Sequence, residues 1–290
     1  MAHQERKKIM KTWKKIVLGV SLISLFLGGG LVAWGYSQGG LTDLQNKTIS
    51  EQDYVKKEVK DFNKIDIKSS SYNVLIKNGD VDKATLSYYQ KTKNPIDTSV
   101  KDGQLTINDS NSELDSTSNK HINFFGLKDL VRLSTLNEEV RNKTIVITLP
   151  KKQTIDFLKV DLATGNLDLS NSTIKQADIN LNVGDLTFTK MIVSNLKANL
   201  DVGSVDSDHT LFTNSDLSIA MGDYSGDNLI FNGHNKLDVT SGDIEIVLKD
   251  YTLNVQADSH SGEVDITNNL KISKDNTLTI TSDLGDITVE

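Results

Sequence analysis

The sequence contains no cysteine among its 290 residues, and aromatic residues make up only 6%. The absence of cysteine excludes disulfide scaffolds, thiolate metal sites, cysteine nucleophiles and lipid attachment through cysteine. It does not identify the compartment, because many exported proteins use no cysteine. Hydrophobic residues still make up 37% of the chain, which is enough to build a core and excludes a wholly disordered protein.

Basic residues are scarce in the second half of the chain. Residues 161–290 contain 21 Asp or Glu, 7 Lys and no Arg, a balance of −14. Because the whole chain carries −7, residues 1–160 carry +7. Binding to nucleic acid requires clustered Lys and Arg that neutralise phosphates, so we expect no nucleic-acid partner for the acidic half.

A run of 21 residues without a charged side chain, 16–36, lies near the N-terminus. At about 1.5 Å per residue it can cross a hydrocarbon core of about 30 Å. The preceding tail, 1–15, carries six Lys or Arg and one Glu, which keeps the N-terminus cytoplasmic. We therefore predict a single-pass transmembrane helix held by membrane lipid in the cell membrane, with the bulk of the chain extracytoplasmic.

A cleaved signal peptide is the main alternative to this anchor. Its apolar region usually spans about 7 to 15 residues and ends at a small-x-small cleavage site. The run at 16–36 is longer and ends with the bulky Trp34 and Tyr36, which favours an uncleaved helix. The polar, lysine-rich segment 37–60 then indicates a linker, with a short helix near Glu51 to Val59.

A nearly constant period organises the second half of the chain. Glycines recur at intervals of 19, 19, 19, 20, 20 and 23 residues. Apolar residues occupy most positions five and three before and two after each glycine, an alternation that indicates strands. One unit cannot bury its inward face alone, but successive units stacked in parallel about 4.8 Å apart share a core. The predicted repeat corners are Gly165, Gly184, Gly203, Gly222, Gly242, Gly262 and Gly285.

These observations predict an all-β fold, a parallel β-solenoid (β-helix-like) ectodomain over 61–290. An antiparallel meander is the alternative, but hairpins would make successive strands alternate in character, whereas like residues recur here in the same phase. Before residue 160 the repeats are less regular; Tyr72 stands where a glycine would be, and Asp102 and Gly103 mark another corner. An irregular insertion at 108–142 interrupts them. The apolar residues in 121–142 approximate one face of a helix and indicate a helical cap or a surface patch. The cap is favoured, because the end of a solenoid needs its open core covered.

Several stretches carry a family resemblance: DFNKIDIKSSSYNVLIKNGD, VKDGQLTIN, LATGNLDL, LNVGDLTF and VTSGDIEI. They resemble the bacterial DUF4097 proteins, a family of β-strand-repeat proteins described as adhesins, over about residues 60–290. The resemblance lies in the repeat pattern, not in a catalytic signature. It implies a β-helix-like ectodomain without assigned enzymatic activity, and some relatives are associated with Gram-positive envelope-stress systems.

Catalytic signatures are missing from the sequence. The histidines beyond the anchor are scattered, and no glycine-x-serine-x-glycine elbow surrounds a serine. A Walker loop, a dinucleotide fingerprint and a zinc-protease helix are also absent. We therefore predict that the protein is not an enzyme and has no catalytic residues and no cofactor or metal. The four histidines are His121, His209, His234 and His260.

The residue directly after each glycine is usually acidic, which leaves two alternatives open. Paired carboxylates in a groove cleave polysaccharides, and aligned carboxylates bind Ca²⁺. The uniformity of the column and the lack of Arg and Trp in 161–290 argue against cleavage. Like charges about 4.8 Å apart repel by only about 0.9 kcal/mol in water, so no ion is required. The column is Asn166, Asp185, Ser204, Asp223, Asp243, Glu263 and Asp286.

The function favoured by location, charge and missing catalytic residues is binding, adhesion or envelope-stress sensing. Stacked repeats present a flat acidic surface, for which envelope proteins or cationic peptides are suitable partners. An inert spacer is the remaining alternative.

Overall fold

The computed structural model describes residues 52–91, 95–109 and 143–290. The predicted transmembrane helix at 16–36 and nearly all of the insertion at 108–142, with its helical cap, lie outside these ranges. Within them, no helix has the length and apolar character needed to cross a membrane. Glu51–Glu290 form one compact unit.

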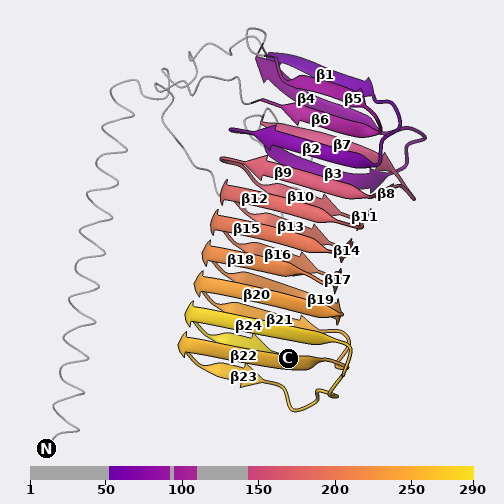
Figure 1. Ribbon diagram of the computed structural model, residues 1–290. Helices are drawn as coiled ribbons and strands as arrows, with labels where there is room; N and C mark the ends of the chain where they lie inside the picture. Colours follow the sequence, from indigo (N-terminus) through magenta and orange to yellow (C-terminus); the bar gives the residue numbers. More distant parts are fainter. Residues whose placement is uncertain (1–51, 92–94, 110–142) are drawn as a thin grey trace, which may run out of the picture. The chain divides into compact units, whose positions relative to one another are not determined.

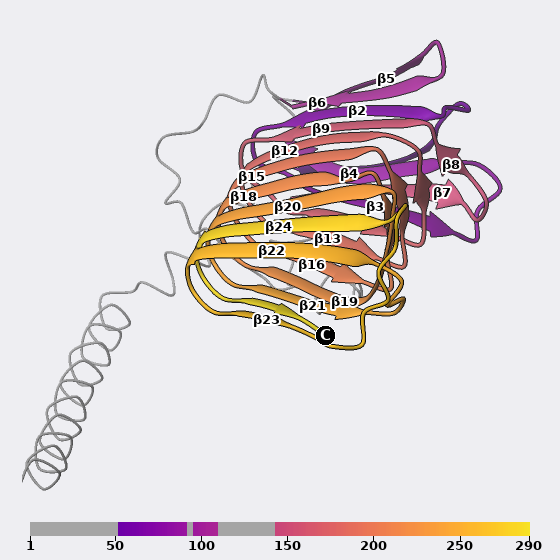
Figure 2. The same cartoon turned by 60° about the horizontal axis from the view of Figure 1, so that its bottom comes forward.

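One repeat shows how the chain builds each level of this unit. β12 (Ala177–Val183) ends at the corner glycine Gly184, and β13 (Leu186–Thr189) follows on a second side. A left-handed turn at Lys190 then leads into β14 (Ile192–Ser194) on a third side. Alternate side chains point inward, so each level contributes to a shared interior. Figure 2 views the stacked levels obliquely from one end.

The ten strands of one sheet, here called the front sheet, carry the side of each level that precedes the corner glycine. All its neighbouring pairs are parallel except β5 and β6. In spatial order they are β5 (Asp97–Lys101), β6 (Gln104–Asn108), β2 (Lys64–Ser69), β9 (Phe157–Leu162), β12, β15 (Leu196–Val202), β18 (Asp216–Met221), β20 (His234–Ser241), β24 (Thr277–Leu284) and β22 (Asn254–Ser261).

The opposite side is the back sheet, which is parallel except where β4 pairs with β1 and β7. Its strands are β1 (Gln52–Glu58), β4 (Thr85–Lys91), β7 (Thr144–Pro150), β3 (Asn73–Gly79), β10 (Leu167–Ser170), β13, β16 (Val205–Asp208), β19 (Tyr224–Asn232), β21 (Ile244–Leu248), β25 (Ile287–Val289) and β23 (Val264–Ile266). The narrow third side consists of β8 (Thr154–Ile155), β11 (Thr173–Ile174), β14, β17 (Leu211–Thr213) and the end of β19.

The interior is mainly apolar. Leu181, Leu200 and Ile219 lie in consecutive front strands and are each at most 2% exposed. The Phe188 and Phe212 rings meet edge to face with centroids 5.2 Å apart. Each such side chain contributes about 1.5 to 3 kcal/mol by leaving water. The predicted all-β, mainly parallel architecture is therefore confirmed for the described residues, and the meander is excluded there.

The order of the levels differs from the order of the sequence at both ends (Figure 1). β24 lies between β20 and β22, so the last level of the sequence takes the place next to last in the stack. At the other end, β2 lies between β6 and β9. Side-chain size explains the exchange near the C-terminus, because Leu278 and Ile280 of β24 are buried whereas Val255 and Ala257 of β22 are only half-buried. The strand with the larger apolar side chains takes the interior position.

Two further sequence expectations differ from the structure. Asp102 and Gly103 form the tight turn of the antiparallel β5–β6 hairpin, because both have positive φ (50° and 73°), as hairpin turns of the Asp-Gly type require. They are not a solenoid corner. The short helix expected near Glu51 to Val59, within the linker 37–60, is instead strand β1, which pairs with β4. Its lysines obscured the strand pattern, and charged side chains of this kind protect a sheet edge.

Candidate functional site

The structure places the seven predicted glycines in one column, at the corner where the front sheet passes into the back sheet. Six of them have φ between 139° and 148°, and Gly262 does not have a positive φ. A Cβ added at Gly203 would lie 2.0 Å from the carbonyl oxygen of Gly184. The corner therefore needs glycine both for its dihedral angle and for the close passage of neighbouring levels. In the stack, Gly285 lies next to Gly242, and Gly262 lies next to Gly285 at the end of the column.

The acidic column directly after these glycines has a structural role. The Asp185 carboxylate accepts a hydrogen bond from the backbone N–H of Ser204 (3.0 Å), and Asp223 accepts one from the N–H of Asp243 (2.9 Å). The same bond recurs at nearly every level, so each side chain satisfies a backbone donor that the corner leaves unpaired. This explains the uniformity of the column without a metal ion or catalysis. The other acceptors are Asn73, Asn166, Ser204, Asp243 and Asp286.

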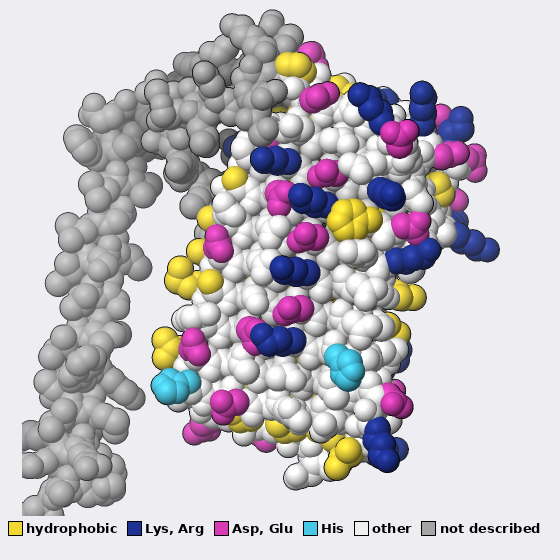
Figure 3. Space-filling model, in the orientation of Figure 1, with side chains coloured by type: hydrophobic (Ala, Val, Ile, Leu, Met, Phe, Trp, Pro, Cys, Tyr) yellow, Lys and Arg dark blue, Asp and Glu magenta, His cyan; other side chains and the backbone are white. Residues whose placement is uncertain are grey.

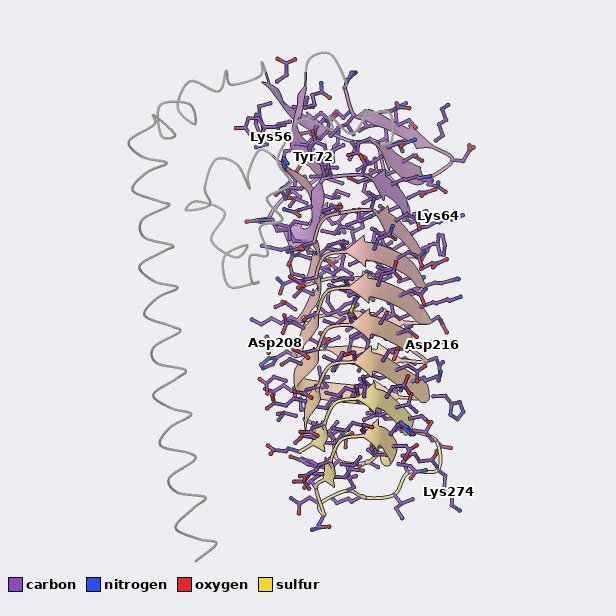
Figure 4. The ribbon with its side chains drawn as sticks, turned by 90° about the vertical axis from the view of Figure 1, so that its left-hand side faces the viewer. Lys56, Lys64, Tyr72, Asp208, Asp216 and Lys274 are labelled. Carbon is purple, nitrogen blue, oxygen red and sulfur yellow. The ribbon has the colours of Figure 1, made fainter. Side chains whose placement is uncertain are left out.

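Acidic side chains gather on the outer side of the back sheet and at the adjoining glycine corner. On the sheet, the acids Asp206, Glu245 and Asp265 occupy every second level of one column, about 9.6 Å apart, with neutral residues and no Lys or Arg between them. At the corner, the acids follow one another at consecutive levels, about 4.8 Å apart. Figure 4 shows Asp208 on this side of the stack, opposite Asp216 on the front side. We call this surface the acidic face. It consists of Asp206, Asp208, Asp227, Glu245 and Asp265 on the sheet, and Asp223, Asp243, Asp286 and Glu263 at the corner.

The outer side of the front sheet carries a different pattern. Acidic and basic residues alternate in register over six consecutive strands, and neutral residues, Thr106 and Thr279, stand at the two ends. Figure 3 shows Lys and Asp side chains alternating down this side. We call this column the charge ladder. Its members are Asp66, Lys159, Asp178, Lys197, Asp216 and Lys236.

One carboxyl group is buried on the back sheet. The Asp168 side chain lies in the same outward column as Asp206 and is 5% exposed. Within the part of the chain that the structure describes, its Oδ2 has no hydrogen-bond partner. Burial raises the pKa of Asp168 to about 7, although a hydrogen bond from Thr187 acts in the opposite direction. The pKa of Asp206, whose side chain is exposed, is also raised, by partial desolvation first and then by the charge of Asp185. Asp168 is therefore poorly solvated as a carboxylate.

Three metal-ligating side chains meet at the turn after the back sheet. Ligand atoms of Asp208, His209 and Asp227 lie within 4.8 Å of one another, and His209 Nδ1 lies 2.6 Å from Asp208 Oδ1. A hollow of about 170 Å³ lies beside them, lined in part by Lys190 and Lys249. The lysine side chains oppose the binding of a cation here. His234 bonds Thr277 on the front sheet, and His121 lies outside the described residues, so the structure does not gather the histidines.

The charge ladder and the Asp208 cluster were not predicted from the sequence, although both leave a signal in it. The ladder is the column six residues before the corner glycines, where Lys159, Asp178, Lys197, Asp216 and Lys236 alternate. Asp208 and Asp227 are 19 residues apart, which is one repeat. The sequence does not indicate that Asp168 is buried, because Asp206 stands at the same position of its own repeat and is exposed.

Comparison with solved structures gives matches of low sequence identity. A structure from Clostridium sporogenes, named a “putative cell adhesion protein”, is 16% identical and covers 82% of this chain and 99% of its own, with a TM-score of 0.37. A “putative adhesin” from Bacteroides fragilis is 15% identical, with coverages of 83% and 97% and a TM-score of 0.38. A “putative lipid binding protein” from Parabacteroides distasonis is 12% identical, with coverages of 83% and 98% and a TM-score of 0.44.

No curated protein matches the sequence. A family model, Toastrack DUF4097, matches residues 62–290, the range that holds the glycine corners and both charged surfaces. This match covers most of the chain and confirms the resemblance seen in its repeats. The chain belongs to the Toastrack DUF4097 family.

Proposed function

We propose that this protein is a binding protein, anchored in the membrane by residues 16–36, that acts outside the cytoplasm in adhesion or envelope sensing by contact and not by catalysis. The observation that carries the proposal is the acidic face. Its carboxylates repeat along the stack, about 4.8 Å apart at the corner and about 9.6 Å apart on the sheet, which suits an extended partner with regularly spaced Lys or Arg.

The chemistry of this surface selects the class of partner. Aligned carboxylates create a negative potential that attracts cationic proteins and peptides and repels anionic polymers. The corner acids are held by their hydrogen bonds to the next level, so they are already ordered before a partner arrives. The positive tail 1–15 supports the location, since it favours export of everything after the anchor.

The proposal is tested with a fluorescent octalysine peptide and the full-length protein in a non-ionic detergent. We expect saturable binding at about 0.05 M salt. Binding should be strongly weakened at about 0.5 M salt, where electrostatic attraction acts over a shorter distance. Neutralising three members of the acidic face (Asp206→Asn, Glu245→Gln and Asp265→Asn together) should weaken binding about tenfold, since exposed ion pairs contribute about 0.5 kcal/mol each.

A matched control removes the same number of negative charges from the front sheet (Asp66→Asn, Asp178→Asn and Asp216→Asn together). This control should bind the peptide nearly as well as the unmodified protein. Equal losses in both triple variants would show that only net charge matters and would contradict a dedicated surface. No binding at low salt would contradict the cationic partner itself.

Polysaccharide cleavage remains a second candidate because two carboxyls in one column, Asp168 and Asp206, have raised pKa values. Two levels separate them by about 9.6 Å, close to the spacing of acid and base in inverting glycosidases. However, Asp168 is buried, and the hollow of about 170 Å³ lies elsewhere, at the Lys190 and His209 turn. Release of reducing ends from a wall glycan by the unmodified protein, and not by Asp168→Asn, would favour this candidate.

A further inference from the structure

The charge ladder on the front sheet is not neutralised along its own column. Lys159 and Lys236 reach sideways to Asp161 (3.7 Å) and Asp238 on their own strands. Among the described residues, the side chains of Asp178 and Lys197, at the centre of the ladder, form no hydrogen bond or ion pair. The middle of the sheet therefore presents an unpaired acid and an unpaired base side by side.

The order of charges in the ladder is self-complementary. The ladder has six members, begins with an acid and ends with a base. If a second copy is turned upside down, an acid of one ladder therefore stands opposite a base of the other at every level. We propose that the front sheet binds the front sheet of a second copy of this chain, in antiparallel orientation. The two-fold axis passes between Asp178 and Lys197, as an isologous interface requires.

This arrangement gives an opposite-charge contact at every position of the ladder. Asp178 faces Lys197 of the second copy, Lys159 faces its Asp216, and Asp66 faces its Lys236. The symmetry of the interface then repeats each contact once. Placing the copies parallel, or shifting them by one level, brings acid against acid and base against base, which is unfavourable.

The neighbouring outward column fits the same arrangement. Lys68, Asp161, Asn180, Asn199, Ser218 and Asp238 follow one another in register. The two-fold axis places Lys68 against Asp238 of the second copy, and Asn180 against Asn199. Within one copy, these two amides already form a hydrogen-bonded ladder, in which Asn199 donates to Asn180 at 2.9 Å. No like charges meet in this column either.

The size of the surface is adequate for a weak, specific dimer. Six strands about 4.8 Å apart and about 20 Å long present about 580 Å² per copy, or about 1,160 Å² in total. Stable interfaces bury about 1,200 to 2,000 Å², and smaller ones are transient. This self-association is separate from the acidic face, which lies on the opposite side and stays accessible.

The test exchanges the signs of the ladder in full-length protein in a non-ionic detergent, with association measured by energy transfer between labelled copies. An all-acidic ladder (Lys159→Asp, Lys197→Asp and Lys236→Asp) and an all-basic ladder (Asp66→Lys, Asp178→Lys and Asp216→Lys) should each weaken self-association at least about 30-fold. Mixing the two variants should restore it. Combining all six exchanges in one chain should also restore it.

Orientation and net charge need their own readouts. Because the chain has no cysteine, a donor at Lys101→Cys and an acceptor at Ile272→Cys label opposite ends of the stack. Antiparallel copies bring these labels together, and two labels at Ile272→Cys stay apart. Exchanging Asp206, Glu245 and Asp265 for Lys changes the net charge as much as the all-basic ladder does and should leave association intact.

Three results would overturn the inference. They are monomers at all concentrations, undiminished association of both single-sign ladders, and failure of their mixture to associate. None of them affects octalysine binding to the acidic face, so failure of the dimer is distinguishable from failure of the proposed function.

Discussion

Replacing Asp168 with Asn is expected to stabilise the folded protein at about pH 8 by up to about 4 kcal/mol. The pKa of Asp168 rises from 3.8 to about 7 on folding, because burial penalises the carboxylate. Each unit of pKa corresponds to 1.36 kcal/mol, which gives the stated upper value. Asparagine keeps the shape of the side chain and removes the charge.

The pH dependence follows from the sign of this change. Below about pH 3, Asp168 is protonated in the folded and the unfolded chain, and it carries no penalty. As the pH rises from about 3 through about 7, the unfolded chain ionises first, and folded stability is lost. Urea unfolding of the two proteins should therefore coincide near pH 3 and separate near pH 8. Asp265→Asn, in the same column but exposed, is the matched control and should change stability by less than about 0.5 kcal/mol.

Equal stability of Asp168→Asn and the unmodified protein at pH 8 would show that the carboxylate is solvated. The burial assigned to Asp168 would then be wrong, and Asp168 would no longer support the glycan-cleavage candidate.

Replacing Gly203 with Ala is expected to destabilise the fold by at least about 3 kcal/mol. The φ of Gly203 is 148°, a conformation that costs an L-residue about 1 to 3 kcal/mol. A Cβ there would also lie 2.0 Å from the carbonyl oxygen of Gly184, so one backbone must move away from the other. Levels in a solenoid stabilise their neighbours, and the defect therefore weakens the stack on both sides.

Gly79→Ala is the matched control for this substitution. Gly79 does not have a positive φ, and its added Cβ would approach a side-chain methyl group of Thr148, which can rotate, and not a backbone atom. We expect a loss of about 1 kcal/mol or less. Thermal unfolding followed by circular dichroism compares the two, and similar losses would show that the corner does not require glycine.

The period of the sequence predicted the levels because each level repeats one physical requirement. The inward columns must be apolar, and the corner must lack a Cβ where backbones pass, so both leave a mark at about 19 residues. Leu181, Leu200 and Gly203 could therefore be assigned without coordinates. The family resemblance rested on these same columns, and the family match over residues 62–290 confirms it.

The order of the levels could not be predicted from the same columns. Gly262 and Gly285 fit the corner equally well, and only the longer interval of 23 residues before Gly285 hinted at a chain that doubles back. The choice depends on how much apolar surface β24 and β22 each bury, which is a property of the whole stack. The hairpin at Asp102 and Gly103 was missed because a glycine after an aspartate suits a tight turn as well as a corner.

The measurement that tests the central claim most directly is a pair of engineered disulfides, because both charged surfaces exist only if the levels stack in this register and order. Ser241 and Leu284 are paired in neighbouring strands, about 4.8 Å apart, which suits a disulfide. Ser241 and Ser261 are two levels apart, at about 9.6 Å, which is too far. Oxidation should link Ser241→Cys to Leu284→Cys in the folded protein and leave Ser241→Cys with Ser261→Cys unlinked. The opposite result would contradict the stacking on which both surfaces depend.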